Sequence, residues 1–328
     1  MALDVKVKID INKPAGNSSF GYPLIINVGE SAIEYTECRS VEEVATAGFE
    51  AATDTYKAAA IMFGQNNPPE KIAVCQVTGT IVDGLNSIRD KEYRHIMTVG
   101  TFGEDETTES VANYVETTVK DKMYFATVTS VDGLANIGSH SRTVYFVHTD
   151  PLAVAALIGE AAGRSVGSFT YKNLILKSIS PMDLSDTEIA TIHEANGITF
   201  VTKAGDNVTT EGKCASGEYI DIVDCKDYII SNLEYQTQKT LNNAAKVPYD
   251  NTGIALLESV AVNVLKNAYN LGMIATDEEG KPMYSADYAL RSETTEDDRA
   301  ERKYVGGKFS FTLSGAIHEV DIVGEIII

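Results

Sequence analysis

Several residue types are scarce in this chain of 328 residues, and their scarcity excludes some functions. Tryptophan is absent, and only four cysteines occur, none of them in a C-x-x-C pair. This usage predicts reduced, buried thiols and no disulfide framework. The first residues contain no apolar signal-peptide core, and no long uninterrupted apolar run follows. We therefore expect neither secretion by a signal peptide nor a membrane-spanning segment.

Basic residues are in the minority: 27 lysines and arginines face 47 aspartates and glutamates, for a formal charge of −20. A surface this negative repels phosphate backbones and anionic lipids, so nucleic acid and membranes are disfavoured as direct partners. The excess of acid also favours solubility at high concentration, which suits a protein made in many copies.

No nucleotide-binding loop can be found. The nearest candidate, GDNVTTEGKC at 205–214, has six residues between its glycines and no Ser or Thr after Lys213. No G-x-G-x-x-G follows a predicted strand either. If the protein performs mechanical work, the sequence offers no bound nucleotide to drive it.

Metal sites are also not indicated, because the histidines show neither H-x-x-x-H nor H-E-x-x-H spacing. We expect structural or surface roles for all five of them: His95, His140, His148, His193 and His318. The acidic DEEGK at 277–281 lacks the ligand spacing of a calcium loop and predicts a hairpin turn instead. We therefore expect no cofactor.

The stretch GRSVG at 163–167 matches the G-x-S-x-G pattern, with Ser165 in the nucleophile position. A nucleophile elbow requires a strand before the serine and a helix after it. Here a helical pattern precedes the serine and the strand-like SFTYKNLIL (168–176) follows it. The order favours a glycine-rich helix exit and a protein that is not an enzyme, with an α/β hydrolase using Ser165 as the alternative.

Residues 20–205 predict a mixed α/β domain, because strand-like apolar runs alternate with helical patterns. The predicted strands are 23–28, 71–77, 95–100, 123–129, 143–149 and 198–203. The predicted helices are 54–65, 106–120 and 150–164. In the last of these, Asp150 is a suitable N-cap and Pro151 a suitable first helical residue. The alternation favours a partly parallel sheet with helical cover.

Residues 206–314 have a different character and predict a C-terminal domain. Two long amphipathic helices are expected at 219–243 and 251–273, then a turn at 277–282 and a strand at 284–292. The run ETTEDDRAERK (293–303) holds five acids and three bases. Such a run is usually a solvated helix face, and a docking helix is the alternative.

Both ends of the chain alternate like β-strands and lie outside the predicted globular body. Residues 1–19 form an N-terminal arm and hinge, in which NKPAGNSS (12–19) breaks regular structure, and residues 315–328 form a C-terminal strand arm. Edge strands in the chain's own sheet are one interpretation. The other is augmentation of a sheet in a neighbouring copy, which propagates head to tail. The apolar faces of the two arms consist of Val5, Val7, Ile9 and Ile11, and of Val320, Ile322, Ile326 and Ile328.

The C-terminal third resembles the phage tail sheath proteins, which form the contractile outer cylinder of myophage tails and related particles. The stretches that carry the resemblance are 217–241, 246–274, 297–303 and 309–326, and 48–74 resembles the N-terminal region of that family more loosely. Within them the ordered series is Ile220-Asp221, Asp227, Pro248-Tyr249, Thr252-Gly253, Arg299, Arg302 and Gly315-Ala316-Ile317-His318.

The resemblance implies a subunit that stacks in hexameric layers around an inner tail tube, with arms that knit neighbouring copies together. A baseplate signal would trigger contraction, which drives the tube through a cell envelope on conformational energy stored during assembly. Implied partners are other copies, the tube protein, and baseplate and tail terminator proteins. The particle is a virion tail or a phage-derived bacteriocin, assembled in the bacterial cytoplasm. Another tail component or an adhesin of similar fold remains an alternative.

The resemblance also implies a helix of conserved type at 296–303. Charge contacts suit a face that must grip a tube and later release it. We assign the tube-facing role to its charged residues: Asp297, Asp298, Arg299, Glu301, Arg302 and Lys303.

Overall fold

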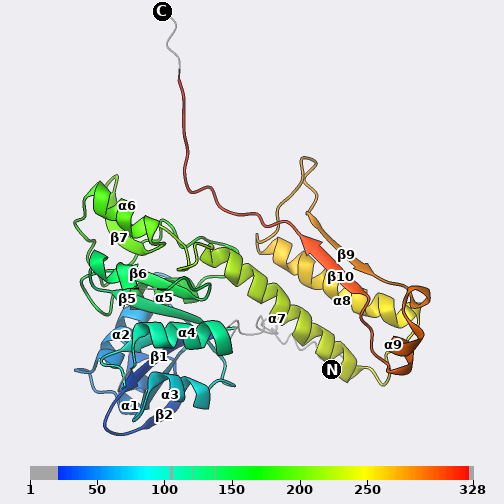
Figure 1. Ribbon diagram of the computed structural model, residues 1–328, viewed down its shortest axis with the longest axis horizontal. Coiled ribbons are helices and arrows are strands. Elements are labelled where there is room, and N and C mark those ends of the chain that lie inside the picture. Colours follow the sequence, from blue (N-terminus) through cyan, green and yellow to red (C-terminus); the bar gives the residue numbers. More distant parts are fainter. Residues whose placement is uncertain (1–20, 104–105, 120, 137, 325–328) are drawn as a thin grey trace, which may run out of the picture.

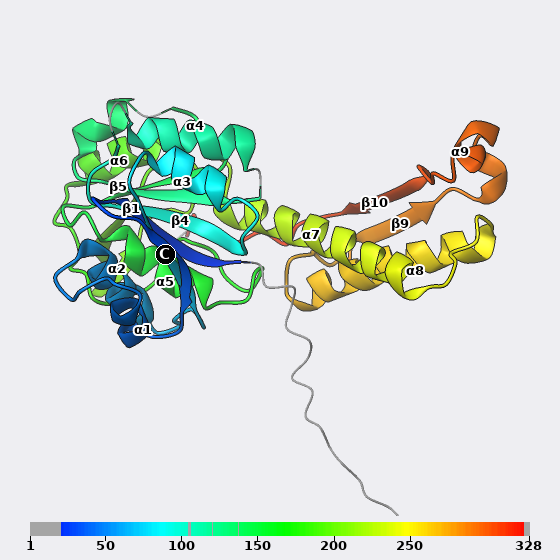
Figure 2. The ribbon, with the colours of Figure 1, turned by 90° about the horizontal axis from the view of Figure 1, so that it is seen from below.

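The computed structural model describes residues 21–324 except 104–105, 120 and 137. The predicted N-terminal arm, with Val5, Val7, Ile9 and Ile11, lies outside the described residues, as do Ile326 and Ile328 of the C-terminal arm. The body has two parts, which we call the large part (21–219) and the C-terminal module (220–314). Figures 1 and 2 show the long helix α7 (Ile220–Asn243) running from the large part into the elongated module.

An eight-stranded sheet in the order β2-β3-β1-β4-β5-β6-β7-β8 forms the centre of the large part. The strands from β3 to β7 pair in parallel, and β2 and β8 add antiparallel edges. The strands are β1 (Tyr22–Val28), β2 (Ile33–Cys38), β3 (Ile72–Val77), β4 (Tyr93–Val99), β5 (Met123–Val128), β6 (Thr143–Val147), β7 (Ile198–Lys203) and β8 (Asp206–Thr209). All six predicted strands of this domain are therefore confirmed, as is the partly parallel, mixed α/β class.

Helices cover both faces of the sheet. Along β1, Ile25 points into a core formed with α1, α2 and α5, while Leu24 and Ile26 point into a core formed with α3, α4 and α6. These helices are α1 (Val41–Thr46), α2 (Asp54–Phe63), α3 (Ile81–Ser87), α4 (Thr108–Thr118), α5 (Val154–Ala162) and α6 (Asp186–Glu194). Burial on both faces explains why the inner strands are continuous apolar runs.

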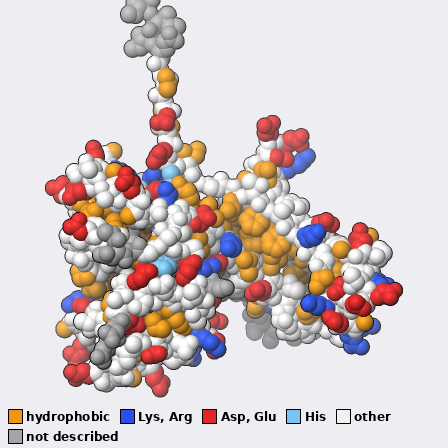
Figure 3. Space-filling model, in the orientation of Figure 1, with side chains coloured by type: hydrophobic (Ala, Val, Ile, Leu, Met, Phe, Trp, Pro, Cys, Tyr) orange, Lys and Arg blue, Asp and Glu red, His pale blue; other side chains and the backbone are white. Residues whose placement is uncertain are grey.

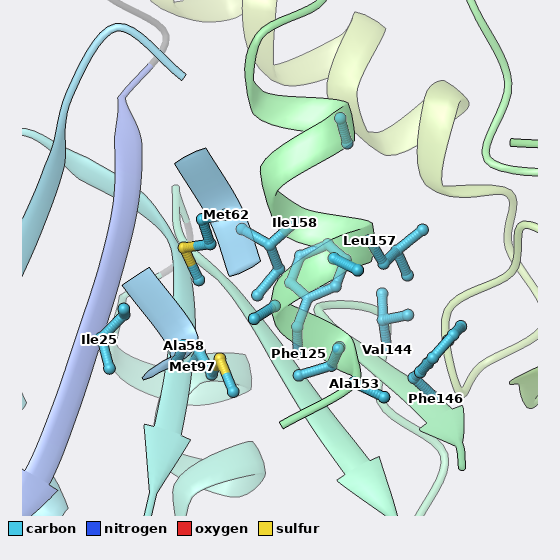
Figure 4. Packing of buried hydrophobic residues seen from close by; sticks show 14 of the residues in the cluster. Ile25, Ala58, Met62, Met97, Phe125, Val144, Phe146, Ala153, Leu157 and Ile158 are labelled. Atoms are coloured by element: carbon cyan, nitrogen blue, oxygen red, sulfur yellow. The ribbon is translucent and has the colours of Figure 1, made fainter. Parts of the chain in front are cut away.

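Helix α5 is the most deeply buried helix pattern that the sequence predicted. Met62 of α2 and Ile158 of α5 lie together against the sheet in Figure 4. A Cβ on Gly159 would lie 2.6 Å from the Met62 backbone, so glycine permits the two helices to approach closely. The predicted start at Asp150 differs from the structure: Asp150 Oδ1 accepts the Leu152 N–H in a preceding turn, and the helix begins at Val154.

The C-terminal module contains the two long helices that the sequence predicted, α7 and α8 (Asn251–Asn270). Helix α8 packs against α7 and against a two-stranded antiparallel sheet of β9 (Tyr284–Tyr288) and β10 (Gly307–Phe311). The hairpin turn at 277–281 is confirmed by the bond from Asp277 N to Lys281 O. The border at 205 stays a prediction; β8, which follows it, pairs with β7 in the large sheet.

Candidate inter-subunit surfaces

The C-terminal tail leaves the body without joining either sheet. Residues 315–324 form no helix or strand, and Figure 1 shows them projecting away from the rest of the chain. Ile317, Val320, Ile322 and Val323 are 85%, 71%, 89% and 97% exposed. Residues 315–324 therefore do not form an edge strand in the chain's own sheet. So many exposed apolar side chains in one segment mark a contact surface.

The β9/β10 sheet is the second feature that lacks cover. Within the described residues its two strands pair only with each other, so both outer edges keep unpaired backbone groups. Phe309 is 42% exposed, and its ring stacks on Phe311 at a centroid distance of 6.3 Å. Because a two-stranded sheet is marginal by itself, added strands would stabilise it.

Two cavities lie between α7 and the β10 region. One, of about 420 Å³, joins the end of α7 and the start of α8 to the start of β10. The other, of about 320 Å³, lies between the first turns of α7 and residues 313–316. Figure 3 shows hydrophobic side chains gathered on the module on this side. The larger cavity is lined mainly by apolar and aromatic residues, among them Leu241, Val247, Pro248, Tyr249, Ile254, Leu257, Tyr288, Tyr304 and Val305.

The charged residues predicted to face a tube lie at the end of the module far from the large part (Figure 1). Helix α9 (Glu296–Ala300) is shorter than the predicted 296–303, because Arg302 takes a left-handed conformation with φ 57° after it ends. Asp298 bonds the Thr295 hydroxyl, and Arg299 bonds the carbonyls of Arg291 and Thr294. The side chains with no bond or ion pair to other described residues are those of Asp297, Glu301, Arg302 and Lys303.

A buried set of ion pairs, which we call the α7 ion-pair network, joins α7 to the large sheet. Arg94 of β4 is 2% exposed and donates from Nε to Asp224 (3.2 Å) and from Nη1 to Asp227 (2.9 Å). Arg142 donates to the other Asp227 oxygen at 2.8 Å. Burial raises the pKa of Asp227, but bonds from Arg142 and the charge of Arg94 outweigh it and hold that pKa below its ordinary value. The network fixes the direction in which α7 leaves the sheet.

Two residues that an enzyme could use, Ser165 and His95, line the same cavity of about 460 Å³. Ser165 is exposed and follows α5 directly, as predicted, but residues 168–180 form no strand. His95, beside the network, has two ring nitrogens without a hydrogen-bond partner in the described chain, and burial lowers its pKa to about 4. It packs edge-on against Phe125 at 5.3 Å, as a neutral core residue would.

A carboxylate of the chain itself caps a helix N-terminus next to the parallel sheet. Parallel sheets of this kind bind ligands at the carboxyl ends of their strands, often at a helix N-terminus. Here the Glu106 carboxylate takes that position on α3, accepting the N–H groups of Ile81 (2.7 Å) and Val82 (2.8 Å). Among the described residues, no group of three or more His, Cys, Asp or Glu could hold a metal ion. No helix in the described chain is long and apolar enough to span a membrane.

Neither a protein-family model nor a curated protein matches the sequence. Solved structures do match over nearly its whole length. The contracted sheath complex of PVC, an extracellular contractile injection system, has a TM-score of 0.73 at 10% identity, covering 99% of this chain and 98% of its own. A chain of the anti-feeding prophage baseplate has 0.72 at 11%, covering 100% of both. The contracted helical sheath of that prophage has 0.70 at 12%, covering 100% and 99%.

At these identities the likeness concerns the fold. The chain is a mixed α/β protein with an open two-stranded sheet and an exposed apolar tail. More particularly, it has the fold of the sheath proteins of contractile injection systems.

Proposed function

We propose that this chain is a structural, non-enzymatic subunit of a contractile tail sheath. It would polymerise around an inner tail tube in a virion tail or a tail-like particle, with baseplate and terminator proteins at the ends, and would assemble in the bacterial cytoplasm. Contraction would use conformational energy stored during assembly. The observation that carries the proposal is that one chain with a sheath fold has both an exposed apolar tail and an open two-stranded sheet.

The tail and the open sheet are complementary in chemistry. In the described tail, Val320 and Ile322 share one face of an extended segment, and Glu319 and Asp321 share the other. A neighbour's β9/β10 sheet offers unpaired backbone groups and the exposed Phe309. Each added ladder bond contributes about 1 kcal/mol net, and each buried Val or Ile contributes about 1.5–3 kcal/mol before ordering costs. Because donor and acceptor are different surfaces, the contact is heterologous and propagates.

Electron microscopy of the purified full chain tests the function. We expect regular tubes of uniform width to form as protein concentration is raised, because head-to-tail arm exchange has no built-in end. A subunit that stays monomeric at every salt and protein concentration tested would rule out the proposal. Discs or short rings that never lengthen would favour a different tail component of the same fold.

We further propose that the end of the module around α9 faces the tube, through Asp297, Glu301, Arg302 and Lys303. All four side chains are exposed and free of bonds to the described chain, so they are available to a partner. Mixed charges provide register and a salt-sensitive grip without a deep apolar bond.

Replacing these four residues by alanine should leave sheath tubes intact and abolish co-assembly with the tube protein of the same particle, measured by co-sedimentation. A matched control is Glu279→Ala with Lys281→Ala, which removes an exposed 2.6 Å ion pair at the hairpin turn. Equal co-sedimentation of the two variants would place the tube contact elsewhere.

A further inference from the structure

One side chain in the described part of the projecting tail is largely covered by the body. His318 has an exposed side-chain fraction of 11%, whereas its neighbours Ile317 and Val320 are 85% and 71% exposed. Its burial therefore has to come from a specific contact with the body, because the segment around it does not pack.

The His318 imidazole occupies a socket formed by Thr170, Tyr219 and Glu211. Its Nε2 lies 2.9 Å from Thr170 Oγ1. Its ring meets that of Tyr219 edge to face, with centroids 4.9 Å apart. Its Nδ1 lies 3.5 Å from Glu211 Oε1. The hydrogen bond to Thr170 and the ring contact with Tyr219 hold the position and the orientation of the imidazole, and the Glu211 carboxylate closes the third side without a hydrogen bond.

The walls of the socket are themselves held in place. Glu211 is buried and lies 3.3 Å from Lys172 Nζ and 3.2 Å from Lys213 Nζ. Lys213 also sits over the Tyr219 ring, 5.2 Å from its centroid. These residues belong to the segment between β8 and α7 and to the loop that packs beside it, so the socket is part of the large part of the molecule.

The chain on either side of His318 behaves differently. Before it, Ser314 N donates to Met273 O at 2.9 Å, which fixes the path from β10 to the socket. After it, the only ion pair from the described tail to the body joins Glu319, which is 92% exposed, to Lys172 at 3.9 Å. An exposed ion pair at that distance contributes little. The free part of the tail therefore starts at Glu319.

We propose that His318 is the pivot of the C-terminal arm: a positioning residue that fixes where the arm leaves the body. A pull on the arm by a neighbouring copy then reaches the large part of the molecule through the socket. It bypasses β10, whose open edge remains free to receive a strand from another copy. That the arm joins a neighbour rests on the proposed function; the pivot itself is a property of the single subunit.

Distances between nitroxide labels in the dilute full-length subunit test the pivot. All four native cysteines are buried, so introduced exposed cysteines can be labelled selectively. One label goes on Ala190, an exposed position of α6, and the other on Ile317 or on Val323. Double electron–electron resonance should give a narrow 190–317 distance distribution and a broad 190–323 distribution.

His318→Ala should broaden the 190–317 distribution to the width of the 190–323 distribution while the melting temperature stays unchanged. Thr170→Val, which removes the hydrogen-bonding partner from the socket side, should broaden it in part and serves if His318→Ala fails to fold. Val320→Ala, in the exposed arm, is the matched control and should change nothing.

A 190–317 distribution that stays narrow in both socket variants, or that is broad in the unmodified chain, overturns the pivot. Because these distances are measured on single subunits, that result would not count against the proposed function. Conversely, a chain that never forms tubes would overturn the proposed function while the distances still report on the pivot.

Discussion

A subunit that lacks residues 319–328 should keep its folded body but form no long tubes. The described part of the deleted segment makes one weak ion pair with the body, from Glu319 to Lys172, so its loss should change the free energy of unfolding by less than about 1 kcal/mol. Assembly, in contrast, would lose the strand that each copy donates. Thermal unfolding followed by circular dichroism and electron microscopy of the same sample measure the two effects.

A point substitution separates the chemistry of the arm from its length. Ile322→Asp places a charge on the apolar face and should abolish tubes as fully as the deletion, because an unpaired charge is costly in a packed sheet interface. Asp321→Asn, on the opposite face, is the matched control and should leave tubes intact. If either the deletion or Ile322→Asp lowers the melting temperature of the monomer, the tail is part of the subunit's own fold.

Deleting residues 1–12 should act like the C-terminal deletion, if the N-terminal arm is also donated.

The inner strands could be predicted because each is buried on both faces and reads as a continuous apolar run, as TVYFV does in β6. The edge strand β2, with the sequence IEYTEC, was missed because its alternation is interrupted by exposed acids. Helix α3 was missed because it is short and has Gly84 in its interior. Residues 168–176 alternate well enough to predict a strand, but Asn173 has φ 62° and breaks the extended backbone.

The sequence placed the tail outside the globular body by its alternation, but it left open whether the tail pairs with the chain's own sheet. The socket of His318 could not be predicted, because Thr170 and Glu211 are distant in sequence and carry no local signal. The same holds for the α7 ion-pair network. Asp224 and Asp227 lie three residues apart on one face of α7, where acidic residues are usually exposed. Their partner Arg94 lies 130 residues before Asp224 in the sequence.

Breaking the α7 ion-pair network should destabilise the subunit strongly. Arg94→Ala should lower the free energy of unfolding by about 3–5 kcal/mol, because it leaves Asp224 and Asp227 buried with less compensation. Arg89→Ala removes an exposed pair with Asp90 at 3.7 Å and, as the control, should cost less than about 1 kcal/mol. Denaturant unfolding of both variants measures the difference. A cost for Arg94→Ala no larger than that of the control would show that the network does not hold α7.

Because of the network, the free energy of unfolding should fall as the pH is lowered. The pKa of Asp227 is lower in the folded chain than its ordinary value. Its stabilising contribution is therefore complete above that ordinary value of about 4 and is lost as pH falls through the folded pKa. Asp227→Asn should remove the loss of stability that comes from protonating this carboxylate at low pH, while lowering stability at neutral pH.

A loosened network should also abolish tubes, because α7 carries the whole C-terminal module. Subunits whose acceptor sheets point in varying directions cannot repeat one contact along a helix.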